Sequence, residues 1–420
     1  MHPILANAID PGFVEGDCAY NAGLVASNRR VYFAIGSHRP DCHARLGCYD
    51  PGARQIVFVK DLGQVLGEPR GIPHGKVHVP LAESDGRLYL ATMQGYADGE
   101  RTGHGTYPGF RILGMDLESG TLVSVVQGPA REGLVAGILD PSRRAYCGLT
   151  YPSGRFCRCD LESGSVEVLG RPCSDWPVAG RLRMRLVYPV CRSLGLDTEG
   201  AVYGSCRSGA VWRAAPGGTP AILPGANVRQ GASEPIDRRG GRENFWRVVL
   251  WEPHERLFYG VHAGTQSLFR FDPDRQRIEP LARIGHPAFH ALGHAPRGSQ
   301  LGLTLGPNRV LYHVVHGPTP GQEAADGTMA WLTSFHLDTQ VFHCHGPLET
   351  HDGERVIFAE SLTTDGDGNL YTIAWVEAAD PAERERLRRL RAEASPSATR
   401  DCGYRIQLVQ IEAESTRETT

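Results

Sequence analysis

The sequence predicts an all-β fold made of seven copies of one four-stranded unit, and three observations lead to this prediction. Glycine (51 residues) and proline (29 residues) are abundant, which indicates a chain with many turns. Apolar residues with a helical period are nearly absent over most of the chain. One phrase, in which a turn precedes an apolar residue and a tyrosine that open a strand, occurs seven times in 420 residues.

The repeat sets the length and the content of each copy. Its tyrosines are separated by 53 to 59 residues and are Tyr32, Tyr89, Tyr146, Tyr203, Tyr259, Tyr312 and Tyr371. The second copy shows four strand-like runs, at residues 76–84, 86–93, 110–117 and 121–127, joined by short turns such as SDG and ESG. Four antiparallel strands repeated seven times describe a single seven-bladed β-propeller domain over residues 1–420.

The last copy carries an insertion. Asp380 and Pro381 precede a charged run with helical spacing, so we expect a helix over about 380–395 with Asp380 as its N-cap. This helix falls between the second and third strands of the seventh blade. The strand-like run 404–411 then helps to complete that blade, and the tail 412–420 is expected to lack structure.

Composition excludes several classes of protein. The net charge of −3 gives no reason to expect binding to nucleic acid or to a membrane surface. No apolar run of about 18 residues predicts a transmembrane helix, and the first residues lack the basic and apolar regions of a secretory signal. The eleven cysteines are odd in number and scattered, which favours reduced thiols in a cytoplasmic protein.

Histidines gather on one predicted face of the propeller. In this fold the first strand of each blade lines a central channel, and the loops after the second strands share one face with the connections between blades. Most of the seventeen histidines fall in these segments. His262 and His316 end the second strands of blades five and six, and His104 lies with Tyr107 in a long loop of blade two. Long loops on one face of a rigid scaffold usually carry function.

A second set of polar residues lies in the predicted inner strands. The position eleven residues before each repeat tyrosine is polar or charged in four blades, namely at Asn21, His78, Arg192 and Glu360. In blade five the turn is one residue longer, which brings Arg247 to this position. Buried charges are costly unless they are paired, hydrated or bound to a ligand. We therefore expect these side chains to face the channel and to contact a small molecule.

The stretch HGKVH, residues 74–78, indicates which kind of metal site suits this fold. On a helix, His74 and His78 would share one face and chelate one ion. In an extended inner strand their Cα atoms are about 13 Å apart, which rejects a helical zinc-protease pair. A metal centre would instead combine His78, His262 and His316, and three neutral imidazoles suit Mn, Fe, Cu, Ni or Zn equally. The alternative is that these histidines are hydrogen-bonded groups around channel water.

The chain resembles seven-bladed propeller lyases of the oligogalacturonate lyase and virginiamycin B lyase type. The resemblance is carried by the repeat DGRLY…G…DLESG and by the histidines at the predicted channel mouth. It implies a divalent ion near the propeller axis with histidine ligands, for which His78, His262 and His316 are the positions here. It further implies elimination across a C–O bond next to an acidic carbon. Because no secretory signal is seen, we expect a small substrate rather than a polysaccharide.

Residue roles follow from this resemblance and from side-chain chemistry. The candidates for substrate binding are Arg192, Arg247, Asn21 and His104. The candidates for proton transfer are Glu360, Tyr107 and Tyr151.

The expected partner is a small-molecule substrate that bears a carboxylate or a carbonyl group. We expect no nucleotide cofactor, because phosphate-loop and dinucleotide motifs are absent, and no nucleic-acid or membrane partner. An oligomer is compatible with the sequence. Two other classes stay open, a metal-free hydrolase or cyclase of the lactonase-like kind and a non-catalytic binding scaffold.

Overall fold

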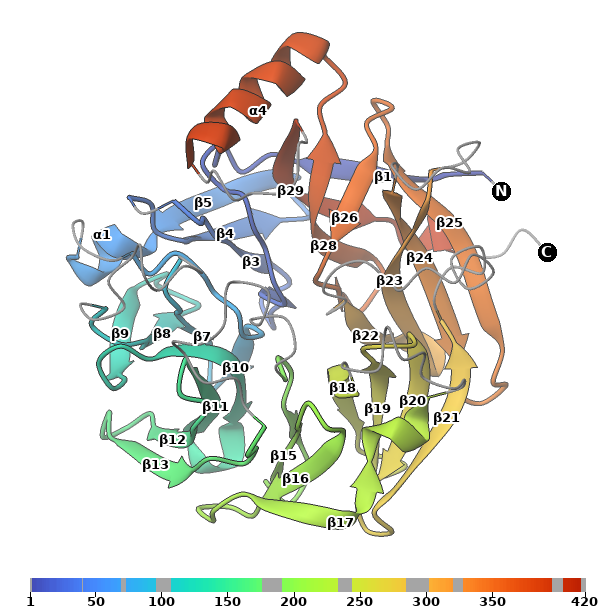
Figure 1. Ribbon diagram of the computed structural model, residues 1–420. Coiled ribbons are helices and arrows are strands. Elements are labelled where there is room, and N and C mark those ends of the chain that lie inside the picture. Colours follow the sequence, from blue (N-terminus) through green and yellow to red (C-terminus); the bar gives the residue numbers. More distant parts are fainter. Residues whose placement is uncertain are drawn as a thin grey trace. The chain divides into compact units, whose positions relative to one another are not determined.

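The computed structural model describes residues 2–39, 41–68, 73–95, 107–175, 191–232, 244–284, 302–319, 328–394 and 403–416. The chain divides into two compact units. The first unit comprises Met1–Val77 and Ile284–Thr420, and the second comprises His78–Arg283. Regular structure in both units is mainly antiparallel β-sheet (Figure 1).

The second unit consists of four four-stranded sheets, which correspond to blades two to five. In each sheet the strands follow chain order, so every blade is an antiparallel meander. Blade two comprises β6 (Ala82–Ser84), β7 (Arg87–Ala91), β8 (Arg111–Asp116) and β9 (Leu122–Gln127). Blade three comprises β10 (Gly133–Asp140), η2 (Pro141–Arg143), β11 (Ala145–Tyr151), β12 (Phe156–Asp160) and β13 (Val166–Gly170). Blade four comprises β14 (Gly195–Leu196), β15 (Val202–Ser205), β16 (Ala210–Ala214), β17 (Ala221–Asn227) and η4 (Val228–Gly231). Blade five comprises β18 (Trp246–Glu252), β19 (Leu257–His262), β20 (Ser267–Asp272) and β21 (Arg277–Arg283).

The first unit holds blades one, six and seven. Blade one comprises β2 (Gly23–Val25), β3 (Val31–Ile35), β4 (Arg45–Asp50), β5 (Gln55–Asp61) and the short helix α1 (Leu62–Leu66). Blade six comprises β22 (Leu303–Gly306), η5 (Pro307–Arg309), β23 (Val310–Pro318), β24 (Thr328–His336) and β25 (Phe342–Thr350). Blade seven comprises β26 (Val356–Ala359), β27 (Thr363–Thr364), β28 (Leu370–Glu377), β29 (Tyr404–Ile411) and β1 (Ile4–Ile9).

The N-terminal strand supplies the outer strand of the last blade, which the sequence did not predict. β1 pairs antiparallel with β29, with Asn7 opposite Gln410, and parallel with β25, with Ile4 opposite Leu348. The two blades therefore form one nine-stranded sheet, in which β1 lies between β25 and β29 (Figure 1). The predicted strand 404–411 is β29, the third strand of the blade.

In at least two blades the repeated tyrosine anchors the turn before it. Tyr203 donates a hydrogen bond to Asp197 at 2.9 Å, and Tyr371 donates one to Asp365 at 3.0 Å. In each pair the acid lies six residues earlier, at the turn between the inner and second strands. In these two blades the hydroxyl group is satisfied while the ring is buried, whereas the buried hydroxyl of Tyr146 has no partner among the described residues.

The insertion in blade seven is a helix, as predicted. The helix α4 (Pro381–Ala394) lies between β28 and β29. Asp380 accepts hydrogen bonds from the backbone N–H groups of Ala382 (3.1 Å) and Glu383 (3.3 Å), so it is the N-cap. No helix of the described residues is long and apolar enough to span a membrane. The 3₁₀ helix η6 (Ala413–Thr416) lies inside the tail that was expected to lack structure, and Asn369 accepts a bond from the Ala413 N–H.

One cysteine pair is oxidised. Cys173 and Cys206 form a disulfide in the second unit, with a Cα–Cα distance of 5.4 Å. The expectation that all cysteines are reduced was wrong for this pair, because a separation of 33 residues in sequence does not reveal proximity in the fold. The fold class is confirmed: an all-β, seven-bladed β-propeller fold with four antiparallel strands per blade and a helical insertion in the last.

Candidate functional site

The predicted site residues that the structure describes lie at one edge of their own blades, named here the entry end. It is the edge at which the inner strand begins and the second strand ends. Antiparallel pairing brings these two points together, with Gly133 opposite Tyr151 in blade three and Trp246 opposite His262 in blade five. The opposite edge carries the turn between the inner and second strands and is named the turn end.

The polar inner-strand positions are buried. In the second unit His78 is 1%, Arg192 4% and Arg247 5% exposed. In the first unit Glu360 is 4% exposed, and Asn21 is partly buried. Each of these residues except Arg247 lies just outside a regular strand, in irregular backbone at the entry end. Their burial agrees with the sequence, and their binding and catalytic roles stay predictions.

Arg247 occupies a β-bulge. The register between β18 and β19 shifts between Trp246 and Val248, which leaves Arg247 as the extra residue. Its guanidinium lies 5.9 Å from the centre of the Phe245 ring. A bulge adds one residue and changes the direction of a side chain, and it is frequent beside functional sites. The sequence indicated the extra residue of blade five in the turn before Tyr259, whereas the structure has an extra residue at Arg247 within β18.

His262 is the last residue of β19 and is fully buried. Its Nδ1 accepts hydrogen bonds from the backbone N–H groups of Gly264 (3.1 Å) and Thr265 (3.2 Å). Burial lowers the pKa of His262 to about 4, so the ring is neutral at pH 7. Because Nδ1 is an acceptor, we assign the single ring proton to Nε2, which has no acceptor among the described residues.

The metal-ligand role predicted for His262 requires the other tautomer, and it stays a prediction. Coordination through Nε2 needs its lone pair, and the ring proton would then move to Nδ1. A proton there would face the two N–H donors of Gly264 and Thr265, and the Thr265 hydroxyl oxygen, 3.2 Å away, would be its acceptor. His78 and His316 lie in different units and stay predictions as ligands. His316 stacks on Phe358 with the ring centres 4.2 Å apart.

A second buried donor follows His262, and the sequence analysis missed it. Gln266 is 1% exposed, and its side-chain Nε2 has no acceptor among the residues that the structure describes. Its backbone has a positive φ of 52° in the turn that its N–H group closes with the His262 carbonyl at 3.0 Å. In the sequence, only its position four residues after His262 pointed to Gln266.

Tyr151 and Arg192 are electrostatically coupled at the entry ends of blades three and four. Burial raises the pKa of Tyr151, and the charge of Arg192 offsets part of that increase. The phenol therefore keeps its proton at neutral pH and acts as a hydrogen-bond donor. Tyr107 is 1% exposed, and its backbone carbonyl accepts a bond from Arg131 at 2.8 Å. His104 lies outside the described residues.

The buried acids that the structure describes in the second unit lie at the turn end instead. Asp140 ends β10, Asp197 follows β14 and Glu252 ends β18. Their oxygens accept bonds from the turns beside them, for example from the Ala201 N–H to Asp197 at 2.8 Å and from the Glu255 N–H to Glu252 at 2.7 Å. Carboxylates in such turns stabilise the fold locally and need no ligand.

Among the described residues of the second unit, buried charge is thus separated along the strands. The arginines buried among its described residues, Arg192 and Arg247, lie at the entry end, and the carboxylates lie at the turn end. His262 and Gln266 add donors at the entry end. An arrangement of cations and N–H donors suits a carboxylate or another anionic group.

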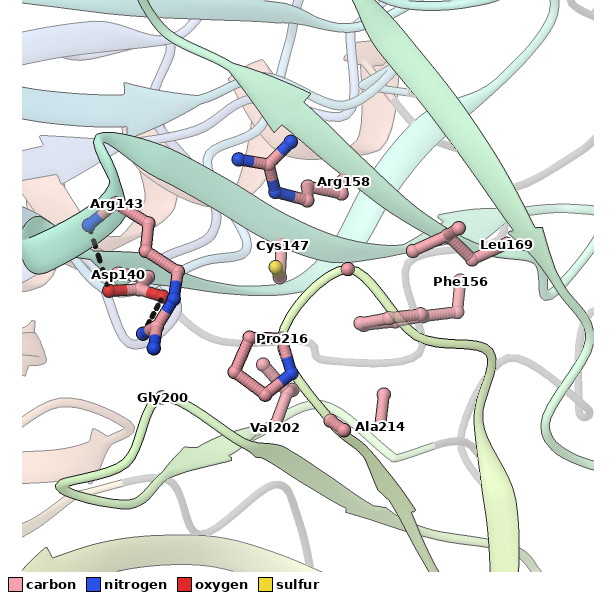
Figure 2. A pocket seen from close by; sticks show the side chains of 12 residues that line it. Asp140, Arg143, Cys147, Phe156, Arg158, Leu169, Gly200, Val202, Ala214 and Pro216 are labelled. Carbon is pink, nitrogen blue, oxygen red and sulfur yellow. Dashed lines mark hydrogen bonds and ion pairs between the residues drawn. The ribbon is translucent and has the colours of Figure 1, made fainter.

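A small pocket lies between blades three and four, away from the entry-end residues. Figure 2 shows it at the Asp140–Arg143 ion pair, with Cys147, Phe156 and Pro216 in its lining. Its free space corresponds to about one water molecule, which is too little for a substrate. We therefore interpret this pocket as a packing gap at the turn end.

Comparisons with known proteins give the fold. No family model matches the chain, and a search of curated proteins found no match. Virginiamycin B lyase from Staphylococcus aureus is similar in structure, with a TM-score of 0.53 at 10% identity over 87% of this chain and 93% of that chain. A "putative 6-phosphogluconolactonase" from Bacteroides uniformis gives 0.50 at 12% identity, over 80% of this chain and 88% of that chain.

A third similar structure has another kind of function. It is the extracellular domain of a "putative hybrid two component system" from B. thetaiotaomicron, with a TM-score of 0.51 at 14% identity, over 96% of this chain and 39% of that chain. Identities this low show a shared propeller fold and do not extend to activity. The predicted resemblance to propeller lyases is confirmed at the level of the fold.

Proposed function

We propose that this protein is an enzyme that binds a small molecule bearing a carboxylate or carbonyl group, and that it acts as a lyase. The burial of two guanidinium groups, those of Arg192 and Arg247, at the entry end of the second unit carries the proposal. Guanidinium groups bind carboxylates through paired N–H donors. The structural similarity to a lyase is consistent with the reaction class and does not establish it.

Donors at the entry end suit the charge that develops during elimination. A base removes the proton from the carbon beside the carboxylate, the C=C bond forms, and the C–O bond breaks with its electrons on oxygen. Negative charge grows on the carboxylate oxygens, where Arg247 and the Nε2–H group of His262 can stabilise it. Tyr151 keeps its proton and is suited to protonate the departing oxygen.

The other predicted roles remain proposals. Glu360 is a buried acid in the first unit and Tyr107 a buried phenol in the second, and both are candidates for proton transfer. His78 and His316 are candidate ligands for a divalent metal, which would polarise the substrate oxygen. His262 is proposed as a donor to substrate instead of a third ligand.

A metal-free hydrolase or cyclase of the lactonase-like kind is the second candidate. The tautomer of His262 favours it, because a neutral imidazole that donates from Nε2 can stabilise an oxyanion without a metal. A cytoplasmic location stays a prediction, and the Cys173–Cys206 disulfide does not support it.

Ligand binding tests the proposed site directly. Thermal unfolding would be measured with small hydroxy acids and lactones and, as matched controls, with the amides of the same acids. We expect carboxylates to raise the unfolding temperature of the wild type and to lose this effect in Arg192→Gln and Arg247→Gln. The control Arg275→Gln changes a side chain that is 81% exposed and should behave as wild type. Equal stabilisation by acids and amides, or full binding in Arg247→Gln, would overturn the proposal.

Product and metal analysis separate the two reaction classes. Elimination creates a C=C bond next to the carboxylate and an ultraviolet absorbance, whereas lactone hydrolysis does not. Elemental mass spectrometry of the wild type, His78→Ala, His316→Ala and His262→Ala tests the metal. We expect any metal at this site to be lost in the first two variants and retained in His262→Ala. An active enzyme without metal would favour the metal-free candidate.

A further inference from the structure

Three ligand-type side chains of the first unit meet in blade one, apart from the residues assigned above. Asp17, Cys18 and His38 each offer one oxygen, sulfur or nitrogen atom, and the three atoms lie within 4.8 Å of one another. Asp17 Oδ1 lies 2.9 Å from His38 Nδ1. Two ligands that each lie about 2.1 Å from one tetrahedral zinc ion are about 3.4 Å apart, so this hydrogen-bonded pair would separate by about 0.5 Å when zinc binds.

The backbone holds these groups in place. Cys18 pairs with Gly36 through the Gly36 N–H to the Cys18 carbonyl at 2.8 Å, and the Asp17 N–H donates to the Gly36 carbonyl at 3.1 Å. The His38 N–H donates to Asp17 Oδ1 at 3.0 Å. A Cβ atom on Gly36 would lie 2.9 Å from Cys18 Sγ, so glycine is what allows the thiol to approach this strand end.

We propose that Asp17, Cys18 and His38 form a zinc-binding site. One carboxylate, one thiolate and one imidazole are ligands that zinc accepts together, and three protein ligands leave a fourth position open. The side chains of His38 and Asp17 are 31% and 12% exposed, whereas Cys18 is buried. Solvent therefore reaches the imidazole and carboxylate side, where an ion can enter and a water molecule can complete the coordination.

The charges around the cluster are compatible with a bound dication. Lys76 is buried nearby, 5.9 Å from the Tyr20 ring, and its charge acts on Cys18. Without metal, burial and Asp17 raise the pKa of the Cys18 thiol, and Lys76 and Tyr20 lower it by less. When zinc binds, the thiol proton leaves to solvent. Zinc with one carboxylate and one thiolate is then neutral, so Lys76 does not face a net positive centre.

A second group of ligand-type side chains could also bind a metal added to the protein. Cys173, Asp175 and Cys206 also lie together, but both sulfur atoms are joined in the disulfide. A disulfide offers no thiolate to a metal. This group binds zinc only after reduction, which the experiment below must control.

Cobalt substitution tests the proposal, because a thiolate ligand gives Co²⁺ a charge-transfer band that imidazole and carboxylate ligands do not. The metal-free, unreduced full chain would be titrated with Co²⁺ and then with Zn²⁺. We expect one equivalent of Co²⁺ to produce the band and Zn²⁺ to abolish it. Cys18→Ser should remove the band, and Asp17→Asn and His38→Ala should weaken Co²⁺ binding about ten-fold or more.

Control variants make each outcome decisive. Cys42→Ser changes a half-buried free cysteine of the same unit and should retain the band. If Cys18→Ser does not fold, His38→Ala provides the test, because the His38 side chain is partly exposed. Absence of the band in the wild type, or a band that persists in Cys18→Ser, would overturn the proposal. A band that is lost in Cys173→Ser alone would assign the metal to the reduced second group. None of these variants touches the candidate ligands His78 and His316.

Discussion

At the scale of single residues, the hydrogen bonds of a histidine ring decide which chemistry it can perform. His262, His78 and His316 were grouped from the sequence as three equivalent neutral imidazoles. The loop after β19 directs two N–H groups at Nδ1 of His262 and so turns Nε2 into a donor. Sequence spacing locates a histidine on a strand but does not reveal which ring nitrogen carries the proton.

The buried state of His262 predicts a pH dependence of stability. Its folded pKa of about 4 lies below the usual value of about 6.5, so the unfolded chain takes up the proton first as pH falls. The native state therefore loses stability from about pH 6.5 down to about pH 4. Between pH 7 and pH 4.5 this group contributes a loss of about 2 to 3 kcal/mol.

The variant His262→Gln removes this titration and retains a side-chain acceptor for the loop. We expect its free energy of unfolding to fall less than that of the wild type between pH 7 and pH 4.5, as measured by urea denaturation. The control variant is His254→Gln, at an exposed position in the turn between β18 and β19. Its free energy of unfolding should fall with pH as much as that of the wild type. If the free energy of unfolding falls equally with pH in wild type and His262→Gln, the lowered pKa assigned to His262 is wrong.

At the scale of strands, glycines make room for aromatic rings on the neighbouring strand. Gly204 in β15 lies opposite Trp212 in β16, and Gly260 in β19 lies opposite Phe269 in β20. A Cβ atom on Gly204 would lie 2.1 Å from the indole ring of Trp212, which is fully buried. We expect Gly204→Ala to lower the free energy of unfolding by about 1 to 3 kcal/mol.

The comparison for this prediction is Gly366→Ala. A Cβ atom on Gly366 meets nothing within 4 Å, so thermal unfolding should change by no more than about 0.5 kcal/mol. A Gly204→Ala variant as stable as wild type would show that Trp212 can move aside. Such collisions depend on cross-strand register, which the repeat phrase alone does not specify.

The sequence predicted much of each blade because local chemistry determines it. The Asp365 turn, the buried Tyr371 and the Asp380 cap are each made by residues close together in the chain. What could not be predicted depends on distant segments. Examples are the pairing of β1 with β29, the Cys173–Cys206 disulfide and the meeting of Asp17 with His38.

The cap of α4 yields a prediction confined to that element. Asp380→Ala removes the acceptor for the N–H groups of Ala382 and Glu383, which typically costs about 1 kcal/mol. Amide hydrogens over Pro381–Ala394 should then exchange about five-fold faster, because a cap stabilises its own helix. Asp380→Asn keeps an acceptor and should exchange at the wild-type rate. Unchanged exchange in Asp380→Ala would show that the packing of Leu387, which is 1% exposed, dominates.

At the scale of the whole chain, the two ends are joined within one blade. β1 and β29 pair across about 400 residues, and β1 also fills the edge of β25. Without β1 both strands would present unpaired N–H and C=O groups, and open strand edges promote association between chains. The last blade is therefore complete only when residues from both ends have been synthesised and have paired.

Two adjacent residues of β1 test this closure. Ile4 is 6% exposed and packs in the cluster that contains Leu348 and Val409, whereas Leu5 is 45% exposed. We expect Ile4→Ser to lower the free energy of unfolding by about 2 to 4 kcal/mol, because it removes a buried side chain and places a hydroxyl in an apolar site. Leu5→Ser should change it by no more than about 0.5 kcal/mol.

Thermal unfolding together with size-exclusion chromatography measures both effects. Association should increase in Ile4→Ser alone, because weaker docking of β1 exposes the edges of β25 and β29. Equal stability of the two variants would mean that β1 is held by its backbone pairing alone and that its apolar face does not close the blade.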